Sequence, residues 1–264
     1  MLTYSYYPGC TLRTKAKELD AYARASAAAL GVELVELPEW QCCGGVYSSA
    51  GNEPVTKLAA VRALIAARDA GTPLVTVCSA CYNVLAQVTH ELRTNPAFAA
   101  KVAQYLELAT PYTGETEVLH LLQVLRDHVG FEAVRAAVKH PLTDRRIAPY
   151  YGCLLLRPGR VLQFDDPENP QTLEALLTAL GATPVITAER NECCGGYRVV
   201  EDAAFAGRRS DAIAASAADF GAELLITACP LCRYNLQKTG RLPVVYFTEL
   251  LAEALGVKEA AQHG

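Results

Sequence analysis

The sequence predicts an α/β protein made of two similar lobes that arose by tandem duplication. Strand-like and helix-like segments alternate along the chain, which is typical of parallel sheets covered by helices. All ten cysteines fall into two sets of five that have the same order. The closing segments of the two halves, 118–130 and 244–256, align without a gap.

In the first half, alternating apolar residues and stops at glycine or proline delimit the elements. A strand over 2–7 ends at Pro8-Gly9, just before Cys10, and a helix over 15–30 ends at Gly31. The other elements expected here are a strand over 32–37, a helix over 54–70, a strand over 73–77, and a helix that starts at Cys81, is interrupted near Asn95-Pro96 and reaches about Leu108.

The second half repeats this order. The expected elements are a strand over 147–151, a helix over 170–180, a strand over 184–188, a helix over 201–220 and a strand over 223–227. The first copy differs mainly by a longer stretch at 86–114. We therefore expect a first domain at 1–140 and a second at 141–264, joined near 139–145.

The composition limits the possible functions. With 264 residues, the chain can bury a large core without disulfides. A net charge of −4 and a pI near 5.8 argue against a nucleic-acid-binding surface. There is no apolar run of the length that a transmembrane helix needs, and the start does not have the pattern of a signal peptide. We expect a cytoplasmic protein, with any membrane association made through a partner complex.

Each half has a single cysteine, a vicinal pair followed by two glycines, and a closing Cys-x-x-Cys. The vicinal pair and the closing motif are separated by 34 residues in both halves, at 44–77 and 195–228. Most of these cysteines follow predicted strands, and ligands of open α/β sheets collect at the carboxyl ends of the strands. Gly44-Gly45 and Gly195-Gly196 allow the backbone to approach a ligand closely. The sequence thus predicts five thiols together in each lobe.

Four kinds of cysteine chemistry are considered for these sets. Structural disulfides do not suit a reducing compartment, and adjacent cysteines bond each other only with strain. Structural zinc uses four ligands, whereas each set has five. Thiol–disulfide exchange at the Cys-x-x-Cys motifs leaves the other six cysteines unexplained. An iron–sulfur cluster in each lobe is favoured, because adjacent thiolates can bind different irons of one cluster.

The repeated pattern resembles the cysteine-rich CCG domain found in the B subunit of heterodisulfide reductase. The resemblance runs from Tyr7-Pro8-Gly9-Cys10 to the segment 247–256, so it covers essentially the whole chain, although both 34-residue spacings are short for the family. It implies pseudo-two-fold symmetry, with two non-cubane 4Fe–4S clusters at the interface between the lobes. By position, the ligands would be Cys10, Cys42, Cys43, Cys78 and Cys81 in the first lobe, and Cys153, Cys193, Cys194, Cys229 and Cys232 in the second.

In that family a disulfide is cleaved reductively between the two clusters, so the resemblance implies this reaction or its reverse. No catalytic residue is expected beyond the cluster ligands. A disulfide takes two electrons whereas each cluster passes one, and metal on both sides can hold the developing thiolates. The chain has no dinucleotide-binding fingerprint and no P-loop. The implied partners are a ferredoxin-like iron–sulfur C-type subunit and a flavoprotein subunit, with a disulfide or thiol as substrate.

Three related groups leave other roles open. E-type subunits of succinate:quinone and quinol:fumarate reductases also resemble the chain at Tyr6–Cys10, and they deliver electrons toward quinone. Subunits of sulfur-oxidising complexes would act on protein-bound sulfur. Iron–sulfur subunits of lactate or glycolate oxidation would transfer electrons only.

Several further residues that lie near the cysteines in the sequence are candidates for contact with substrate or cluster. Some basic residues either clamp an anionic substrate tail or are solvated surface: Arg13, Lys15, Lys17, Arg157, Arg160, Arg190, Arg198 and Arg233. The pairs Tyr82-Asn83 and Tyr234-Asn235 follow the last cysteine of each set, where helix-start packing is favoured over contact with the cluster. Trp40 is expected to shield the first cluster. The five histidines have no ligand spacing.

Overall fold

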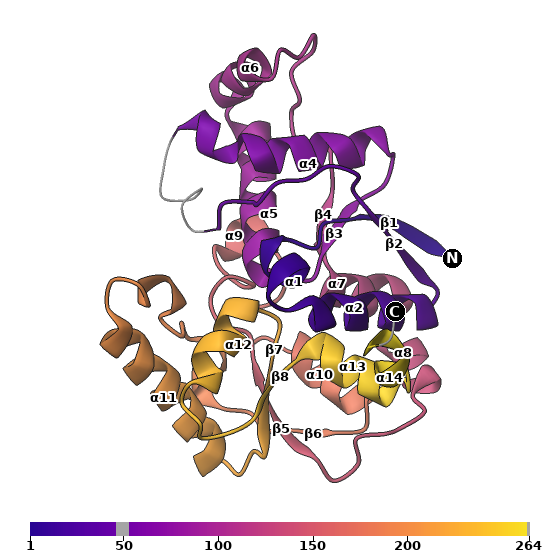
Figure 1. The fold of residues 1–264 in the computed structure, drawn as a ribbon, viewed down its shortest axis with the longest axis vertical. Coiled ribbons are helices and arrows are strands. Elements are labelled where there is room, and N and C mark those ends of the chain that lie inside the picture. The colour runs from indigo at the N-terminus through magenta and orange to yellow at the C-terminus, as the bar shows by residue number, and fades with distance from the viewer. Residues whose placement is uncertain (46–52, 263–264) are drawn as a thin grey trace.

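Each half of the chain forms one four-stranded parallel sheet with helices packed around it (Figure 1). The computed structural model describes residues 1–45 and 53–262. The strand order is β2-β1-β3-β4 in the first sheet and β6-β5-β7-β8 in the second, so the central strands correspond. The predicted α/β class and the tandem duplication are therefore confirmed.

The first sheet follows the sequence prediction closely. Its strands are β1 (Leu2–Tyr6), β2 (Val32–Glu36), β3 (Leu74–Thr76) and β4 (Val118–His120). Its helices are α1 (Cys10–Thr14), α2 (Lys17–Ala29), η1 (Pro54–Lys57), α4 (Leu58–Asp69), α5 (Ser79–Thr94), α6 (Pro96–Tyr105), α7 (Leu121–Gln123), η2 (Val124–Val129) and α8 (Phe131–Ala137). The predicted interruption is confirmed, because Asn95 caps α6 by accepting a hydrogen bond from Phe98 N.

The second sheet departs more from the prediction. Its strands are β5 (Arg146–Tyr150), β6 (Thr183–Pro184), β7 (Leu224–Thr227) and β8 (Val244–Tyr246). Its helices are α9 (Gly159–Leu162), α10 (Thr172–Ala179), η3 (Ala188–Asn191), η4 (Gly196–Arg198), α11 (Ala203–Asp219), α12 (Pro230–Gln237), α13 (Phe247–Ala254) and α14 (Lys258–Gln262). The strand expected over 184–188 is wrong beyond Pro184. On this edge strand Val185 N–H still bonds Ile147 O at 2.8 Å, and the chain then leaves the sheet before η3 begins at Ala188.

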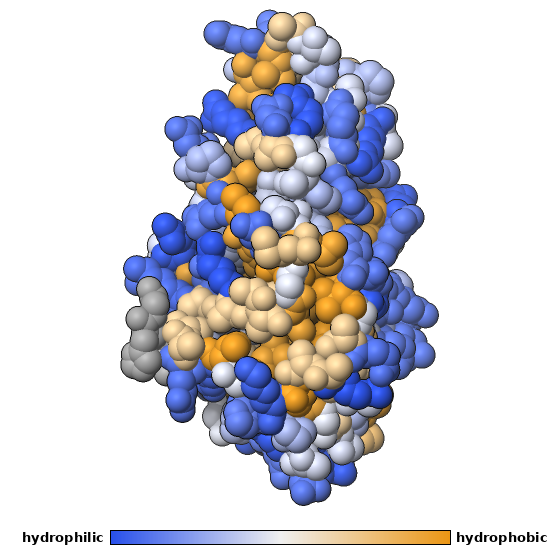
Figure 2. All heavy atoms as spheres, turned by 90° about the vertical axis from the view of Figure 1, so that its right-hand side faces the viewer, coloured by the Kyte–Doolittle hydropathy of each residue, from blue (hydrophilic) through white to orange (hydrophobic). Residues whose placement is uncertain are grey.

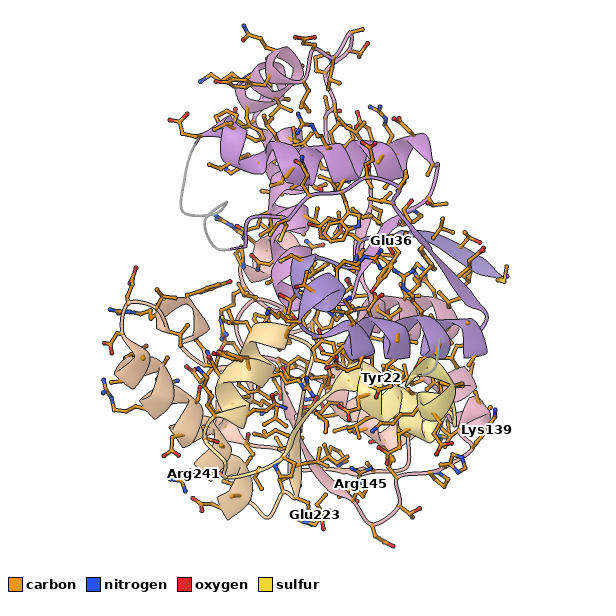
Figure 3. All side chains as sticks on the ribbon, in the orientation of Figure 1. Tyr22, Glu36, Lys139, Arg145, Glu223 and Arg241 are labelled. Carbon is orange, nitrogen blue, oxygen red and sulfur yellow. The ribbon has the colours of Figure 1, made fainter. Side chains whose placement is uncertain are left out.

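The helices that follow the last strand of each half pack on the opposite lobe. α13 and α14 lie along α2, with Tyr22 at their junction (Figures 1 and 3), and Thr248 Oγ1 donates to Leu19 O at 3.0 Å. Reciprocally, α8 packs on α10, and Arg126 Nη1 donates to Phe164 O at 2.6 Å. This exchange joins residues of both halves in one main hydrophobic core. The boundary at 140/141 follows the sequence repeat and stays a prediction.

The seam between the lobes is apolar up to the surface. Figure 2 shows an apolar area in the middle of one face, bordered by hydrophilic residues, at the height where α2 meets α13 and α14 in Figure 1. Partly buried side chains from both halves pack against the main core, among them Leu30, Phe131 and Val257. Hydrophobic burial therefore holds the two lobes in one arrangement.

Candidate metal centres

Both cysteine sets lie at the carboxyl ends of the strands. In the first lobe Cys10 follows β1 and opens α1, while Cys78 follows β3 and is the N-cap of α5. In the second lobe Cys229 follows β7 and is the N-cap of α12. The vicinal pairs lie in the loops after β2 and η3. The parallel topology thus places the cysteines where the sequence predicts them, at the edge where α/β sheets bind ligands.

In the first set, four of the five thiols form two close pairs. The Sγ atoms of Cys10 and Cys42 lie 3.4 Å apart, and those of Cys43 and Cys81 lie 3.6 Å apart. Cys10 and Cys42 are exposed, whereas Cys43, Cys78 and Cys81 are buried. Hydrogen bonds from the Cys42 and Cys81 thiols lower the pKa of Cys43, and a hydrogen bond from Cys81 lowers the pKa of Cys78. The same hydrogen bonds raise the pKa of Cys42 and Cys81, so the thiolate, the form that binds metal, is favoured at Cys43 and Cys78.

The second set repeats this geometry in a more enclosed form. The Sγ atoms of Cys194 and Cys232 lie 3.6 Å apart, which matches the Cys43–Cys81 pair. Cys153 and Cys193 are half-buried, whereas their counterparts in the first lobe are exposed. A hydrogen bond from the Cys153 thiol lowers the pKa of Cys193 to about 6. All ten cysteines are free thiols, so neither set contains a disulfide.

Nitrogen donors also face the sulfurs of the second set. Gly195 N–H donates to Cys193 Sγ at 3.3 Å, and Asn235 Nδ2 donates to Cys194 Sγ at 3.7 Å. A hydrogen bond from Cys232 and one from the Gly196 N–H contribute to lowering the pKa of Cys194 to about 7. These donors stabilise negative charge on sulfur, as hydrogen-bonding groups around metal-bound thiolates do.

One glycine in each lobe leaves room for a sulfur. A Cβ at Gly9 would lie 2.7 Å from Cys81 Sγ, and a Cβ at Gly152 would lie 3.2 Å from Cys232 Sγ. Both glycines have positive φ, +80° and +66°, which residues other than glycine adopt only with strain. These glycines precede Cys10 and Cys153, so the backbone of each lobe is shaped around its thiols.

A tyrosine in each lobe supports the vicinal pair, a role that was not predicted from the sequence. Tyr7 Oη donates to Gln41 O at 2.5 Å, and Tyr150 Oη donates to Glu192 O at 2.7 Å. The two accepting residues immediately precede the vicinal pairs. Burial, followed by nearby thiolates, raises the pKa of Tyr7 and Tyr150, so both hydroxyls stay protonated. The sequence does contain a sign of this role, because each tyrosine lies three residues before the first cysteine of its set.

The residues present fit an iron–sulfur cluster in each lobe. The donor set consists of reduced cysteines, with backbone and amide N–H groups aimed at sulfur and a glycine where a side chain would strike it. Thiolates with such hydrogen bonds are the usual ligands of iron–sulfur clusters. Within 1–45 and 53–262, no three His, Cys, Asp or Glu side chains are already grouped to hold one metal ion.

The two sets approach each other at the seam. Ser79, next to Cys78, donates from its backbone N to Ala228 O at 3.1 Å, and Ala228 precedes Cys229. The burial of Tyr246, and then its proximity to Cys78 and Cys229, raises the pKa of that phenol. One buried tyrosine therefore lies close to thiols of both lobes, and Cys78 and Cys229 lie near the interface.

Several of the candidate anion-binding residues contact protein groups instead. Arg157 donates to Asn191 O at 2.8 Å, and Arg198 lies 5.2 Å from the Phe205 ring. Arg233 contacts Glu18 of the first half at 3.5 Å and Glu249 of its own half at 3.8 Å. Arg13, Lys15, Lys17 and Arg160 are exposed. A substrate clamp stays a prediction for the exposed ones.

Arg190 is buried and has a structural role, so it is not a solvated surface residue. Its Nε lies 3.2 Å from Glu174 Oε1, and both side chains are about nine-tenths buried. Arg190→Met is expected to destabilise the fold by about 3–5 kcal/mol, because it leaves a buried carboxylate unpaired. Burial already raises the pKa of Glu174, so the folded state binds its proton more tightly than the unfolded chain. The loss in unfolding free energy should therefore grow as the pH rises through that pKa, measured by chemical denaturation.

The control for this prediction is Arg13→Met. Arg13 is exposed and lies 3.7 Å from the partly buried Glu36, so little change in stability is expected. An unfolding free energy of Arg190→Met equal to that of the unchanged protein would contradict the structural role of Arg190.

The tyrosine–asparagine pairs have different roles in the two lobes. Tyr82 Oη donates to Leu162 O, and Asn83 Nδ2 donates to Leu154 O, both at 2.8 Å, so this pair contacts the opposite lobe. Tyr234 is exposed, whereas Asn235 contacts Cys194 Sγ. Helix-start packing alone therefore does not describe these residues.

Trp40 lies beside the loop of the first vicinal pair. Its ring packs edge-on against Tyr7, with centroids 5.2 Å apart, and its Nε1 donates to Glu36 Oε1 at 3.1 Å. A cavity of about 620 Å³ is lined by Trp40 together with Arg13, Glu36, Gln41 and Arg62. Shielding of a cluster by Trp40 stays a prediction.

The fold and the site define a class: tandem α/β proteins with a set of five cysteines in each repeat. The model of the cysteine-rich CCG domain matches this chain twice, at residues 4–86 and 147–237. These matches cover well over half of the chain. The protein belongs to this family, as a tandem-domain relative of the B subunits of heterodisulfide reductases.

Relatives align over almost the entire chain. The chain is 32% identical to the 8-methylmenaquinol:fumarate reductase membrane anchor subunit of Wolinella succinogenes, over 96% of this chain and 92% of that protein. It is 28% identical to the B subunit of the ferredoxin/F(420)H(2)-dependent CoB-CoM heterodisulfide reductase of Methanosarcina acetivorans, over 97% and 90%. The relatives thus carry two different functional names.

A solved structure supports the fold alone. A hypothetical protein from Helicobacter pylori superposes with a TM-score of 0.74 at 15% identity. The alignment covers 96% of this chain and 49% of that chain, so this chain spans about half the length of that structure. Among the described residues, no helix is both long and apolar enough to cross a membrane.

Proposed function

We propose that the protein is the iron–sulfur subunit of a heterodisulfide-reductase-like complex, with one 4Fe–4S cluster of the non-cubane type in each lobe. Cys10, Cys42, Cys43, Cys78 and Cys81 would hold the first, and Cys153, Cys193, Cys194, Cys229 and Cys232 the second. The observation that carries this proposal is the matched geometry of the two thiol sets, with the Cys43–Cys81 and Cys194–Cys232 pairs both at 3.6 Å.

The proposed reaction is the reductive cleavage of a disulfide, or its reverse, between the two sites. A disulfide, two electrons and two protons give two thiols, and the clusters would supply the electrons one at a time. The residues of the chain position the ligands: Tyr7 and Tyr150 fix the vicinal pairs, and Gly9 and Gly152 leave space for sulfur. Exposed Cys10 and Cys42 give the first site its contact with solvent.

The electrons would come from a ferredoxin-like C-type iron–sulfur subunit and a flavoprotein subunit in the cytoplasm. The name of one heterodisulfide reductase relative supports a ferredoxin-like donor, because that reductase is ferredoxin- or F(420)H(2)-dependent. An oxidoreductase of this kind works as part of a multi-subunit complex.

A second candidate function is electron relay toward a quinone in an E-type or related subunit. The relative in Wolinella succinogenes supports it, since that protein is a subunit of a methylmenaquinol:fumarate reductase and is 32% identical. In this case the two sites would pass electrons without binding a substrate sulfur, and a partner complex would hold the protein at the membrane.

Paramagnetic resonance on the anaerobically purified protein distinguishes the two functions. Disulfide chemistry predicts that added thiols change the spectrum of the oxidised protein, because each site would then have to accept a substrate sulfur. The corresponding thioether, in which the sulfur of the thiol is methylated, should have no effect. A spectrum that does not respond to any thiol, together with reduction by a quinol, would contradict the disulfide reaction and support the relay.

A further inference from the structure

The segments that follow β3 and β7 meet at the interface, together with the last residue of β8, in a buried group of hydrogen bonds. We call this group the inter-lobe bridge (Val77, Ser79, Ala228 and Tyr246). Ser79 donates to Ala228 O from its backbone N at 3.1 Å and from its Oγ at 2.7 Å. Tyr246 Oη contacts both lobes, at 2.6 Å from Val77 O and 2.8 Å from Ala228 O. Ser79 and Tyr246 are fully buried.

The bridge connects the two cysteine sets through very few bonds. The Ser79 nitrogen is bonded to the carbonyl carbon of Cys78, and the Ala228 carbonyl carbon is bonded to the nitrogen of Cys229. One hydrogen bond thus joins the peptide units of these two cysteines. Electrons tunnel more readily along covalent and hydrogen bonds than through gaps, so this connection is a short path between the sites.

The bridge is asymmetric although the lobes are symmetric. The counterpart of Ser79 is Pro230, which has no N–H to donate to Val77 O, and Tyr246 donates there instead. The counterpart of Tyr246 is His120, a fully buried ring whose Nδ1 accepts from Leu122 N and which also lies beside the backbone groups of Val77 and Ala228. Tyr246 therefore completes the half of the bridge that proline leaves open.

We propose that the inter-lobe bridge couples the two metal sites electronically, with Ser79 and Tyr246 as positioning residues. This inference rests on the proposed function, which places a cluster at each thiol set. One electron leaves the site of one lobe and enters the site of the other, and no proton or bond is exchanged. The coupling lets a single electron donor, docked on either lobe, supply both sites.

The test compares the paramagnetic spectra of reduced variants that retain their metal. Cys194→Ala and Cys43→Ala provide the spectra of the first and second site alone. The unchanged protein should show broader lines than the sum of these two, because its two spins interact. Tyr246→Phe should reduce the broadening, and Ser79→Pro/Tyr246→Phe should reduce it to the part that the dipolar interaction of two spins through space leaves. Proline suits position 79, since this is the first residue of α5 and Cys78 before it is extended.

A rescue variant separates coupling from stability. Pro230→Ala, added to Tyr246→Phe, supplies a backbone N–H at the position equivalent to Ser79 and should restore the broadening. Tyr112→Phe is the matched control, since Tyr112 is equally buried but bonds Thr116 within the first lobe, and it should leave the spectrum unchanged.

The outcomes separate this inference from the proposed function. Protein without iron and sulfide would refute the proposed function. Protein with full iron whose spectrum equals the sum of the two single sites, or whose double variant keeps all of the broadening, would overturn the bridge. If the double variant fails to fold, an unchanged spectrum in Tyr246→Phe, with no effect of Pro230→Ala, would overturn it as well.

Discussion

Cys43→Ala is expected to remove the metal of the first lobe and leave that of the second, while Cys194→Ala does the reverse. Each of these buried thiols pairs with the second cysteine of the Cys-x-x-Cys motif in its own lobe, at 3.6 Å. Loss of such a thiolate leaves a cluster without a buried ligand. Iron per chain should fall to about half, because the two clusters are bound by separate ligand sets.

The control for the cysteine variants is Ser26→Ala, which removes a buried Oγ that has no hydrogen-bond partner and lies on α2, away from the thiols. Its iron content should match that of the unchanged protein. If Cys43→Ala and Cys194→Ala both kept all their iron, the assignment of ligands would be wrong.

Gly9→Ala is expected to disrupt the first metal site without touching a cysteine. The new Cβ would lie 2.7 Å from Cys81 Sγ, a separation that real Cβ atoms do not tolerate. Cys81 is buried in a close-packed interior, so its sulfur cannot move away without disturbing its neighbours. The variant should lose most of the iron of the first site, measured as iron per chain and as the loss of one of the two paramagnetic signals.

Gly31→Ala separates this clash from backbone strain. Gly31 has a φ of +73°, close to the +80° of Gly9, but its Cβ would meet no atom within 4 Å. The Gly31→Ala variant should therefore lose about 1–2 kcal/mol of unfolding free energy and retain all its iron. Gly152→Ala, with its Cβ 3.2 Å from Cys232 Sγ, should have a weaker effect than Gly9→Ala. Equal iron contents in Gly9→Ala and Gly31→Ala would contradict the role given to Gly9.

The sequence predicted the elements that bring the cysteines together because short-range signals specify them. Pro8-Gly9 ends β1 directly before Cys10, and β3 and β7 are buried strands that lead into Cys78 and Cys229. Parallel strands place such ends at one edge. The short helix α1 was missed, since five residues carry little periodicity.

What depends on contact between distant residues was not predictable. The helices α8 and α13 each pack on the opposite lobe through their apolar faces. An apolar face in the sequence does not show which other helix will cover it. The roles of Tyr7 and Tyr150 depend on carbonyls more than thirty residues away. The role of Tyr246 in the inter-lobe bridge depends on Pro230, which lies in α12 and has no N–H to donate. Residues 46–52, after the first vicinal pair, lie outside the described part of the chain.

The most direct test of the two-cluster assignment is the content of iron and acid-labile sulfide in the anaerobically purified full chain. Two four-iron clusters predict about eight irons with an equal amount of sulfide, and half of each in Cys194→Ala. Zinc without sulfide would contradict the assignment, because the ten thiols would then form structural metal sites with no electrons to transfer.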